Sequence, residues 1–488
     1  MAGTERKPID QSDRNMTYQW LAKNALLPVL DISRRRKVAQ YWKILERNQW
    51  LKPGSLIELQ QKRMRALLKH AYENVPYYHR TFNALGFHSS EIRKIRNLED
   101  LRRLPILKST VVRRGPEELT AKNLSKRETI ARYTSGTTAA PLRFYTTHES
   151  ISWGTAAWLR AYRWGGYELG DKHAVVRAFS TFELRSPFLK IFNRLLRRNV
   201  LLNAYDVSTK LIQESAEKLQ TLRPQFLMGY SWGIHMLADY FLTKGIRPPH
   251  IQAVFVNAET TLPSRRTAIE KAFGCEVYDV YGSREFSTIG AECERHSGYH
   301  IQSENVLLEF IKDGENVGPG ETGSILVTDL HNYAMPFIRY EIGDAGRTSE
   351  DTCPCGRCLP LLKSLEGRNY EFFVTGDGSV LYLRDLDTVF EGLPVKMFQI
   401  VQEKPDHILI NVIPANGYSE KDTEFIKRNI VWNLREPTKI EVRIVHAFVP
   451  ERSGKKRYLI SRLSDQYGKI ERLRKLSEPA SRSTIQDS

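Results

Sequence analysis

The chain has 488 residues, of which 41% are hydrophobic and 26% are charged. This composition is typical of a globular protein with a sizeable core and excludes disorder of the whole chain. No stretch reaches the ~18 apolar residues that a membrane-spanning helix needs, and the opening segment MAGTERKPIDQSDR lacks the apolar core of a secretion signal, so we expect a cytoplasmic protein. The formal net charge of +17 favours anionic partners, without choosing among nucleotides, coenzymes, acidic lipids and nucleic acids.

The pattern of apolar residues predicts three regions in chain order. Residues 1–125 are predicted to be largely helical, because segments such as residues 57–75 place apolar residues three or four positions apart until Pro76 interrupts the pattern. From residue 126 to about 345, short β-rich runs alternate with helical patterns, which favours α/β layers with much of the sheet parallel. Beyond about residue 370, β-rich runs surround a helical pattern and indicate a small α+β unit, and the last residues, 479–488, are predicted to be a disordered tail.

The most informative motif is a hydroxyl-rich loop. Thr134, Ser135, Gly136, Thr137 and Thr138 follow one another and precede a β-prone run. A loop of this kind can turn tightly and present backbone N–H groups and hydroxyls to phosphate oxygens. It is therefore a candidate phosphate-binding loop, and the alternative is an ordinary surface turn rich in Ser and Thr.

Four further motifs follow this loop in a fixed order: Tyr281-Gly282-Ser283-Arg284-Glu285, the run from Arg339 to Asp344, the run from Gly367 to Glu371, and the run from Gly454 to Arg457. With this order and spacing, the sequence resembles the adenylate-forming superfamily of acyl-coenzyme A synthetases and related ligases. The segments at residues 75–78, 104–108 and 353–357 make it similar to the phenylacetate-coenzyme A ligase branch, which includes relatives from capsule biosynthesis. The resemblance covers residues from about 60 to about 460.

The resemblance implies a fold and a reaction. The fold is α/β, with a large N-terminal adenylate-forming domain over residues 1–370 and a small, mobile α+β domain over residues 371–478 that turns about the hinge residue Glu371. A carboxylate attacks the α-phosphate of ATP to give an acyl-adenylate and pyrophosphate, and the acyl group then passes to coenzyme A. An amine acceptor, in an amide-forming ligase, is the alternative.

The resemblance also implies roles for individual residues. Glu285, a hard oxygen ligand, would hold Mg²⁺. Lys455 would approach the α-phosphate and offset the charge that builds up there, with Lys456 as its competitor. The hydroxyl-rich loop would wrap the β- and γ-phosphates. The remaining nucleotide-binding set, in which Tyr281 lies against adenine and Asp344 accepts from the ribose hydroxyls, is Asn257, Glu259, Tyr281, Gly282, Asp344 and Arg368.

The sequence departs from the family pattern at two places in the phosphate loop. Ala139 stands where the family has glycine, and Leu142 stands where many members have lysine. Phosphate binding there must then rely more on backbone and hydroxyl groups than on a side-chain cation of the loop.

A group of Cys and His residues suggests a metal site. Four nitrogen and sulfur ligands make a closed tetrahedral zinc site, which is structural because it leaves no open position. The resemblance implies that the ligands are Cys293, His300, Cys353 and Cys355, with Cys358 and His296 as spare candidates. The alternative is a surface turn with reduced cysteines.

Two other glycine-containing motifs have the letters of signatures from other classes of protein. The run from Gly318 to Gly323 has the letters of a dinucleotide-binding motif, but it precedes a β-run instead of following one, and we reject it. The run from Gly229 to Gly233 has the letters of a nucleophile elbow, so a serine hydrolase that uses Ser231 is the alternative from another class. In the ligase, the same run would border the acyl-substrate pocket, for which the sequence suggests Tyr230, Trp232, Asn257, Tyr278 and Phe286.

Residues 186–198 form a basic amphipathic stretch. Such a helix can contact an anionic membrane surface, or it can pack on the protein core with a solvated basic face. Nucleic-acid binding rests on positive charge alone, since no binding module is recognisable, and we expect no nucleic-acid partner.

Overall fold

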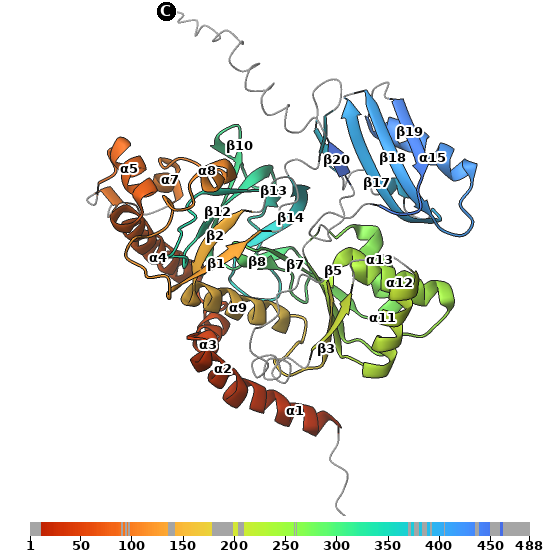
Figure 1. Ribbon diagram of the computed structural model, residues 1–488, viewed down its shortest axis with the longest axis horizontal. Helices are drawn as coiled ribbons and strands as arrows, with labels where there is room; N and C mark the ends of the chain where they lie inside the picture. Colours follow the sequence, from red (N-terminus) through yellow and green to blue (C-terminus); the bar gives the residue numbers. More distant parts are fainter. Residues whose placement is uncertain are drawn as a thin grey trace, which may run out of the picture. The chain divides into compact units, whose positions relative to one another are not determined.

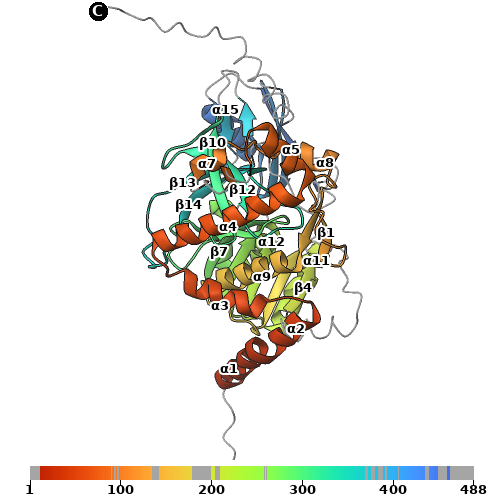
Figure 2. The same ribbon diagram turned by 90° about the vertical axis from the view of Figure 1, so that its left-hand side faces the viewer.

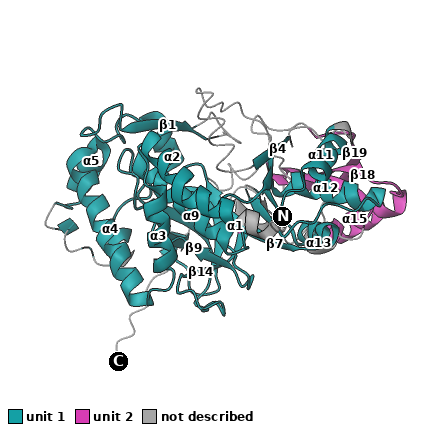
Figure 3. Ribbon diagram, turned by 90° about the horizontal axis from the view of Figure 1, so that it is seen from below, with its two compact units in different colours: residues 1–365, 450–455 teal, residues 366–449, 456–488 magenta. Residues whose placement is uncertain are grey.

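The computed structural model describes residues 11–88, 91–92, 95, 98–134, 142–177, 199–203, 209–257, 259, 261–368, 372–374, 380–382, 388–390, 393–404, 406–434, 439–448 and 459–461. These residues form two compact units, one up to Leu365 and one from Glu366 onward (Figure 3). Within the described ranges, no helix combines the length and the apolar character needed to cross a membrane.

The chain begins with helices, because its apolar residues recur at helical spacing. In α4 (Pro53–Asn74), Leu56, Met64, Leu67, Leu68 and Ala71 share a buried face, and the helix ends before Pro76, as its sequence predicts. Figure 2 shows α3 beside α9 (His148–Arg163) of the following region. The other helices of this part are α1 (Gln11–Leu21), η1 (Ala22–Leu26), α2 (Leu27–Ser33), α3 (Val38–Asn48), α5 (Pro76–Ala84), α7 (Leu98–Arg102) and α8 (Ser109–Arg114).

A 12-stranded sheet organises the rest of unit 1, with the order β11-β10-β12-β13-β14-β9-β8-β7-β6-β5-β3-β4 (Figure 1). Its parallel part contains β3 (His173–Arg177), β4 (Asn199–Asn203), β5 (Phe226–Tyr230), β6 (Ala253–Asn257) and β7 (Glu276–Ser283). The other strands are β8 (Ser287–Ala291), β9 (Tyr299–Ile301), β10 (Val306–Lys312), β11 (Glu315–Asn316), β12 (Thr322–Asp329), β13 (Tyr340–Thr348) and β14 (Leu361–Arg368).

The parallel part of the sheet is smaller than its sequence predicts. Antiparallel pairing begins at the turn between β7 and β8 and continues through β9, and β10, β12 and β13 also pair antiparallel. The physical reason lies in the connections, because a short turn can only join antiparallel neighbours, whereas parallel neighbours need a crossover such as a helix.

Helices cover both faces of the parallel strands. The helices α11 (Thr209–Leu222), α12 (Ser231–Lys244) and α13 (Pro263–Phe273) follow β4, β5 and β6 in turn. On the other face lies α9 (His148–Arg163), where Tyr162 stacks on Phe255 with ring centroids 4.5 Å apart. Val254 and Val256, which alternate with Phe255 along β6, are buried as well. A separate antiparallel hairpin of β1 (Thr129–Tyr133) and β2 (Arg143–Thr147) precedes α9.

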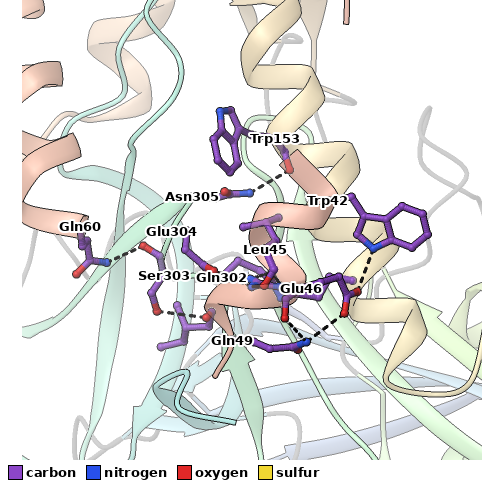
Figure 4. Close-up of polar contacts among 12 residues, drawn as sticks. Trp42, Leu45, Glu46, Gln49, Gln60, Trp153, Gln302, Ser303, Glu304 and Asn305 are labelled. Atoms are coloured by element: carbon purple, nitrogen blue, oxygen red, sulfur yellow. Dashed lines mark hydrogen bonds and ion pairs between the residues drawn. The ribbon is translucent and has the colours of Figure 1, made fainter. Parts of the chain in front are cut away.

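A buried set of polar contacts around Arg160 and Glu304, which we call the polar hub, joins the helices to the strands. Arg160, on α9, is fully buried and donates to both carboxylate oxygens of Glu304, at 2.8 and 2.9 Å, and to the Leu45 carbonyl at 2.8 Å. Figure 4 shows how neighbouring contacts extend the hub, with Gln60 donating to the Ser303 carbonyl at 3.1 Å. The hub thus ties α3, α4 and α9 to the segment after β9.

Unit 2 is a four-stranded sheet with a helix. Its strands lie in the order β19-β18-β17-β20, and Ile426 and Ile430 of α15 are buried along with alternate residues of β18. This arrangement is the α+β unit that the sequence predicts. Its elements are β15 (Phe372–Val374), β16 (Val380–Tyr382), η2 (Thr388–Phe390), β17 (Val395–Lys404), β18 (His407–Pro414), α15 (Glu420–Leu434), β19 (Lys439–Ile444) and β20 (Leu459–Ser461).

Candidate nucleotide and metal sites

The carboxyl ends of β5, β6 and β7 bring several predicted residues to one edge of the sheet. Tyr230 pairs with Asn257, and Asn257 pairs with Val280, the residue before Tyr281. The Asn257 side-chain amide donates to the Tyr162 hydroxyl at 3.2 Å, and Glu259 lies two residues further along. The carboxyl edge of parallel strands is where ligands bind in open α/β sheets, so this edge is the candidate nucleotide site.

Two of the predicted nucleotide residues contact each other directly. The Tyr281 hydroxyl donates to a carboxylate oxygen of Asp344 at 2.8 Å, although the two residues lie on strands that are not neighbours, β7 and β13. A hydrogen bond to a carboxylate is stronger than one between neutral groups and fixes its orientation. Tyr281 therefore positions Asp344, which the sequence assigns to the ribose.

The turn after β7 holds Glu285 in a defined place. An added Cβ at Gly282 would collide with the Ser287 carbonyl oxygen, so only glycine fits the close approach of β7 and β8. The Ser283 hydroxyl accepts from the backbone N–H groups of Glu285 and Phe286, each at 3.2 Å. Glu285 is half-buried and lines a small polar cavity together with Arg132, Asn305, Asp329 and His331.

The base of the hydroxyl-rich loop is closed by hydrogen bonds. The Thr134 N–H donates to the Leu142 carbonyl at 2.9 Å, and the Leu142 N–H donates to the Thr134 hydroxyl at 2.9 Å. Leu142 is buried in the apolar core. This burial explains why a leucine, and not a charged lysine, fits that position.

Some predicted residues lie outside the described part of the chain. These are Ser135, Gly136, Thr137 and Thr138 of the phosphate loop, the hinge residue Glu371, Lys455 and Lys456, and the basic stretch 186–198. Arg368 ends β14, and its side chain is not described either. Their roles stay predictions.

The aromatic residues suggested for the acyl pocket occupy different environments. Tyr230 is half-buried at the carboxyl edge, and Trp232 is buried in the first turn of α12. Tyr278 lies further toward the amino end of β7, where its hydroxyl donates to Glu276 at 2.6 Å. Phe286 packs edge-on against Phe337 in the core, with ring centroids 5.7 Å apart, and also lines the cavity beside Glu285.

Ser231 has the backbone context of a nucleophile elbow but not its chemistry. It is the first residue of α12, directly after β5, and it is fully buried. Its hydroxyl has no hydrogen-bond partner among the residues that the structure describes. A serine nucleophile requires a general base within hydrogen-bond reach, so this geometry does not favour the hydrolase.

The structure brings the four suggested metal ligands together. The ligand atoms of Cys293, His300, Cys353 and Cys355 all lie within 4.8 Å of one another. The sulfurs of Cys293 and Cys353 are 3.6 Å apart, and the Cys355 sulfur is 3.3 Å from His300 Nε2. We call this set the Cys/His cluster.

The protonation states around the Cys/His cluster suit a metal ion. His300 Nδ1 donates to the Leu359 carbonyl at 3.4 Å, which turns Nε2 toward the sulfurs, and burial lowers the pKa of His300 to about 4. Burial raises the pKa of Cys293. Burial also acts to raise the pKa of Cys355, but the backbone N–H and side chain of Arg357 outweigh it and hold that pKa below its ordinary value. The imidazole is therefore neutral, the form that ligates metals.

Contacts around the Cys/His cluster connect it to the N-terminal helices. Arg357 donates its backbone N–H to the Cys355 sulfur at 3.4 Å and pairs with Glu294 at 2.9 Å. The Cys358 N–H donates to the Gln49 carbonyl at 2.8 Å. The two spare candidates lie apart from the ligand set, because the Cys358 sulfur faces a backbone carbonyl and His296 contacts Arg266 and Glu292.

Solved structures establish the class of fold. A 2-hydroxyisobutyryl-coenzyme A ligase in its postadenylation state matches with a TM-score of 0.70 at 20% identity, over 88% of this chain and 94% of that chain. The same ligase in its thioesterification state matches with a TM-score of 0.56 at 20% identity over the same shares. The fold is therefore that of the adenylate-forming coenzyme A ligases.

Sequence relatives narrow the class to a branch. Residues 373–462 match the family model of the CapK C-terminal domain. The chain is 26% identical to a phenylacetate-coenzyme A ligase of Thermus thermophilus over 355 residues, covering 70% of this chain and 77% of that protein. It is 24% identical to Protein CapK of Staphylococcus aureus over 432 residues, covering 84% of this chain and 90% of that protein. The resemblance to the phenylacetate-coenzyme A ligase branch and its capsule relatives is thus confirmed.

Three spatial relationships in unit 1 were not predicted from the sequence. They are the Arg160–Glu304 pair, the hydrogen bond between Tyr281 and Asp344, and the position of Arg132 beside Glu285. A charged residue in the apolar pattern of a helix is the only sequence signal for the first. The other two join segments far apart in the chain and left no local signal.

Proposed function

We propose that this protein is an ATP-dependent ligase that activates a carboxylate as its acyl-adenylate and transfers the acyl group to coenzyme A. The observation that carries the proposal is the hydrogen bond between Tyr281 and Asp344, which joins two of the ordered motifs within one unit of an adenylate-forming fold, with Glu285 four residues after Tyr281. Relatives named as phenylacetate-coenzyme A ligases support the same activity.

In the first half-reaction, a carboxylate oxygen bonds to the α-phosphorus of ATP and the bond to the bridging oxygen breaks, so that pyrophosphate leaves. Asp344, held by Tyr281, accepts hydrogen bonds from the ribose. Glu285 is the residue that would hold Mg²⁺, whose charge would offset that of the phosphates. Lys455 offsets the charge that develops at the α-phosphate.

In the second half-reaction, the thiol of coenzyme A gives up its proton, its sulfur bonds to the acyl carbon, and AMP leaves. Rotation of the smaller domain about Glu371 between the two steps is part of this proposal, as is an acyl pocket lined by residues of the run Gly229–Gly233. An amine acceptor is the second candidate, because no coenzyme A signature is recognisable in the sequence.

The Cys/His cluster is proposed to bind one structural Zn²⁺. Its four ligands would complete a tetrahedral coordination sphere, and the hydrogen bond from His300 to the Leu359 carbonyl orients the imidazole for it. The site would join the segment after β8 to the loop before β14. We also propose a cytoplasmic location for the protein.

Carboxylate-dependent exchange between ATP and pyrophosphate across a panel of acids tests the first half-reaction without knowledge of the acceptor. We expect exchange with at least one acid, and AMP release that depends on coenzyme A. Absence of exchange across a broad panel, together with absence of ATP binding, would contradict the ligase. Acyl transfer to amines but not to coenzyme A would select the second candidate.

Lys455→Ala, with Lys456→Ala as the matched control, tests the assigned lysine. Loss of one preorganised charge typically costs about 10²- to 10³-fold in turnover, so we expect a loss of this size in adenylation only for Lys455→Ala. With acyl-adenylate supplied, this variant should still transfer the acyl group. The reverse pattern in the two variants would reassign the role to Lys456.

A further inference from the structure

Two arginines flank Glu285 beside the base of the hydroxyl-rich loop. Arg132 lies on β1, two residues before Thr134, the first residue of the hydroxyl-rich loop. Arg284 lies in the turn after β7, next to Glu285, and its guanidinium donates to the Tyr133 carbonyl at 3.4 Å. Arg132 and Glu285 line the same small cavity.

Among the described residues, neither arginine forms an ion pair. The neighbour of the Arg132 guanidinium is the Phe144 ring, whose centroid is 5.9 Å away. Burial lowers the pKa of Arg132, the positive charge of Arg284 lowers it further, and Glu285 raises it. The two neighbouring cations oppose each other, and the single carboxylate of Glu285 balances only one of the two charges, so a bound anion would reduce the remaining cost.

The loop itself offers no side-chain cation at position 142, because Leu142 is buried in the apolar core. We propose that Arg132 and Arg284 bind the β- and γ-phosphates of ATP and hold the leaving pyrophosphate, a role that rests on the proposed adenylating function. A guanidinium presents several donors in a fork that matches phosphate oxygens. The charge that the leaving pyrophosphate gains when its bond to the α-phosphorus breaks is then met by cations already in place.

The two arginines therefore distinguish ATP from AMP, which lacks the phosphates that they bind. Isothermal titration calorimetry with ATP, AMP and inorganic pyrophosphate on Arg132→Gln and Arg284→Gln tests this. A hydrogen bond to a charged group corresponds to about 10- to 100-fold in affinity, so each variant should bind ATP and pyrophosphate that much more weakly and AMP unchanged. Arg284→Lys should restore part of the ATP affinity.

Arg143→Gln is the matched control. Arg143 pairs with Tyr133 across the same hairpin, so its side chain leaves the opposite face from Arg132, and its guanidinium lies 5.1 Å from the Tyr145 ring centroid. This variant loses the same charge and should bind all three ligands normally.

The outcomes separate this inference from the proposed function. Unchanged ATP affinity in both variants, in a protein whose wild type binds ATP, overturns the inference alone. Equal weakening for ATP and AMP, or weakening of the carboxylate substrate alone, overturns it as well. A wild-type protein that binds no ATP and catalyses no exchange overturns the proposed function, and this inference with it.

Discussion

Arg160 and Arg132 occupy the same unit but differ in what surrounds their charge. The fully buried Arg160 is satisfied entirely by the protein, through Glu304, Gln302 and the Leu45 carbonyl. Arg132 shares a cavity with Glu285, and no ion pair of it lies among the described residues. A charge inside a protein needs compensation, so an arginine with a complete set of protein partners indicates a structural role, whereas Arg132, with Glu285 nearby but no ion pair among the described residues, fits the proposed binding of phosphate.

The Cys/His cluster shares one property with each of these two arginines. Backbone and side-chain contacts hold its residues in place, and its four candidate ligand atoms lie within 4.8 Å of one another. Under the proposal that it binds Zn²⁺, its role is structural, like that of Arg160, but it depends on a ligand, like the proposed role of Arg132.

Removal of the metal from the Cys/His cluster should have the largest effect on the stability of the protein. Structural zinc sites in small domains bind with an apparent ~10–16 kcal/mol, so a strong chelator or Cys293→Ser should lower the melting temperature by about 10 °C or more. Metal analysis should give about one zinc per chain. Cys358→Ser, outside the ligand set, is the control and should change neither quantity. Folded, active protein that contains no zinc would contradict the proposed zinc site.

Glu304→Gln should destabilise unit 1 strongly, because it leaves Arg160 charged and buried without its partner. Breaking a buried pair typically costs about 3–5 kcal/mol. Glu118→Gln is the matched control, since Glu118 pairs with Arg80 at 2.7 Å on the surface, and there the expected change is about 0–1 kcal/mol. Urea denaturation measures both values. Equal losses of unfolding free energy in the two variants would contradict the structural role of the Arg160–Glu304 pair.

Tyr281→Phe should have a smaller effect, which is confined to ATP binding at the carboxyl edge of the parallel strands. It removes the hydroxyl that donates to Asp344, and the half-buried carboxylate can partly exchange that bond for water. We expect a loss of about 1 kcal/mol, or roughly fivefold, in ATP affinity. Asp344→Ala should weaken ATP binding further. Calorimetric titration with ATP checks this order, and equal affinity in all three proteins would argue against the ribose role.

Ser231→Ala should have the smallest effect. The Ser231 hydroxyl is buried and has no hydrogen-bond partner in the described part of the chain, and removing such a group is nearly neutral, within about 0.5 kcal/mol of unfolding free energy. Acyl transfer should continue, and a fluorophosphonate probe should label neither protein. Labelling of the wild type that Ser231→Ala abolishes would instead establish a hydrolase.

The sequence alone predicted the α/β class, the helical N-terminal block, the α+β C-terminal unit and the branch of relatives. These properties depend on local information, namely the period of apolar residues and the order of short motifs, which are both written along the chain. The extent of the parallel sheet was overestimated, because periodicity does not show which strands pair or in which direction.

Only the tertiary structure decided which side chains meet. Tyr281 and Asp344, Arg160 and Glu304, and the two halves of the Cys/His cluster come from segments at least 53 residues apart, the separation of His300 and Cys353. It also separated Tyr230 at the sheet edge from Tyr278 within β7, although both are aromatic residues near strand ends in the sequence. The physical reason is that a contact depends on strand register and helix packing over the whole unit, and neither is encoded by the residues on either side of it.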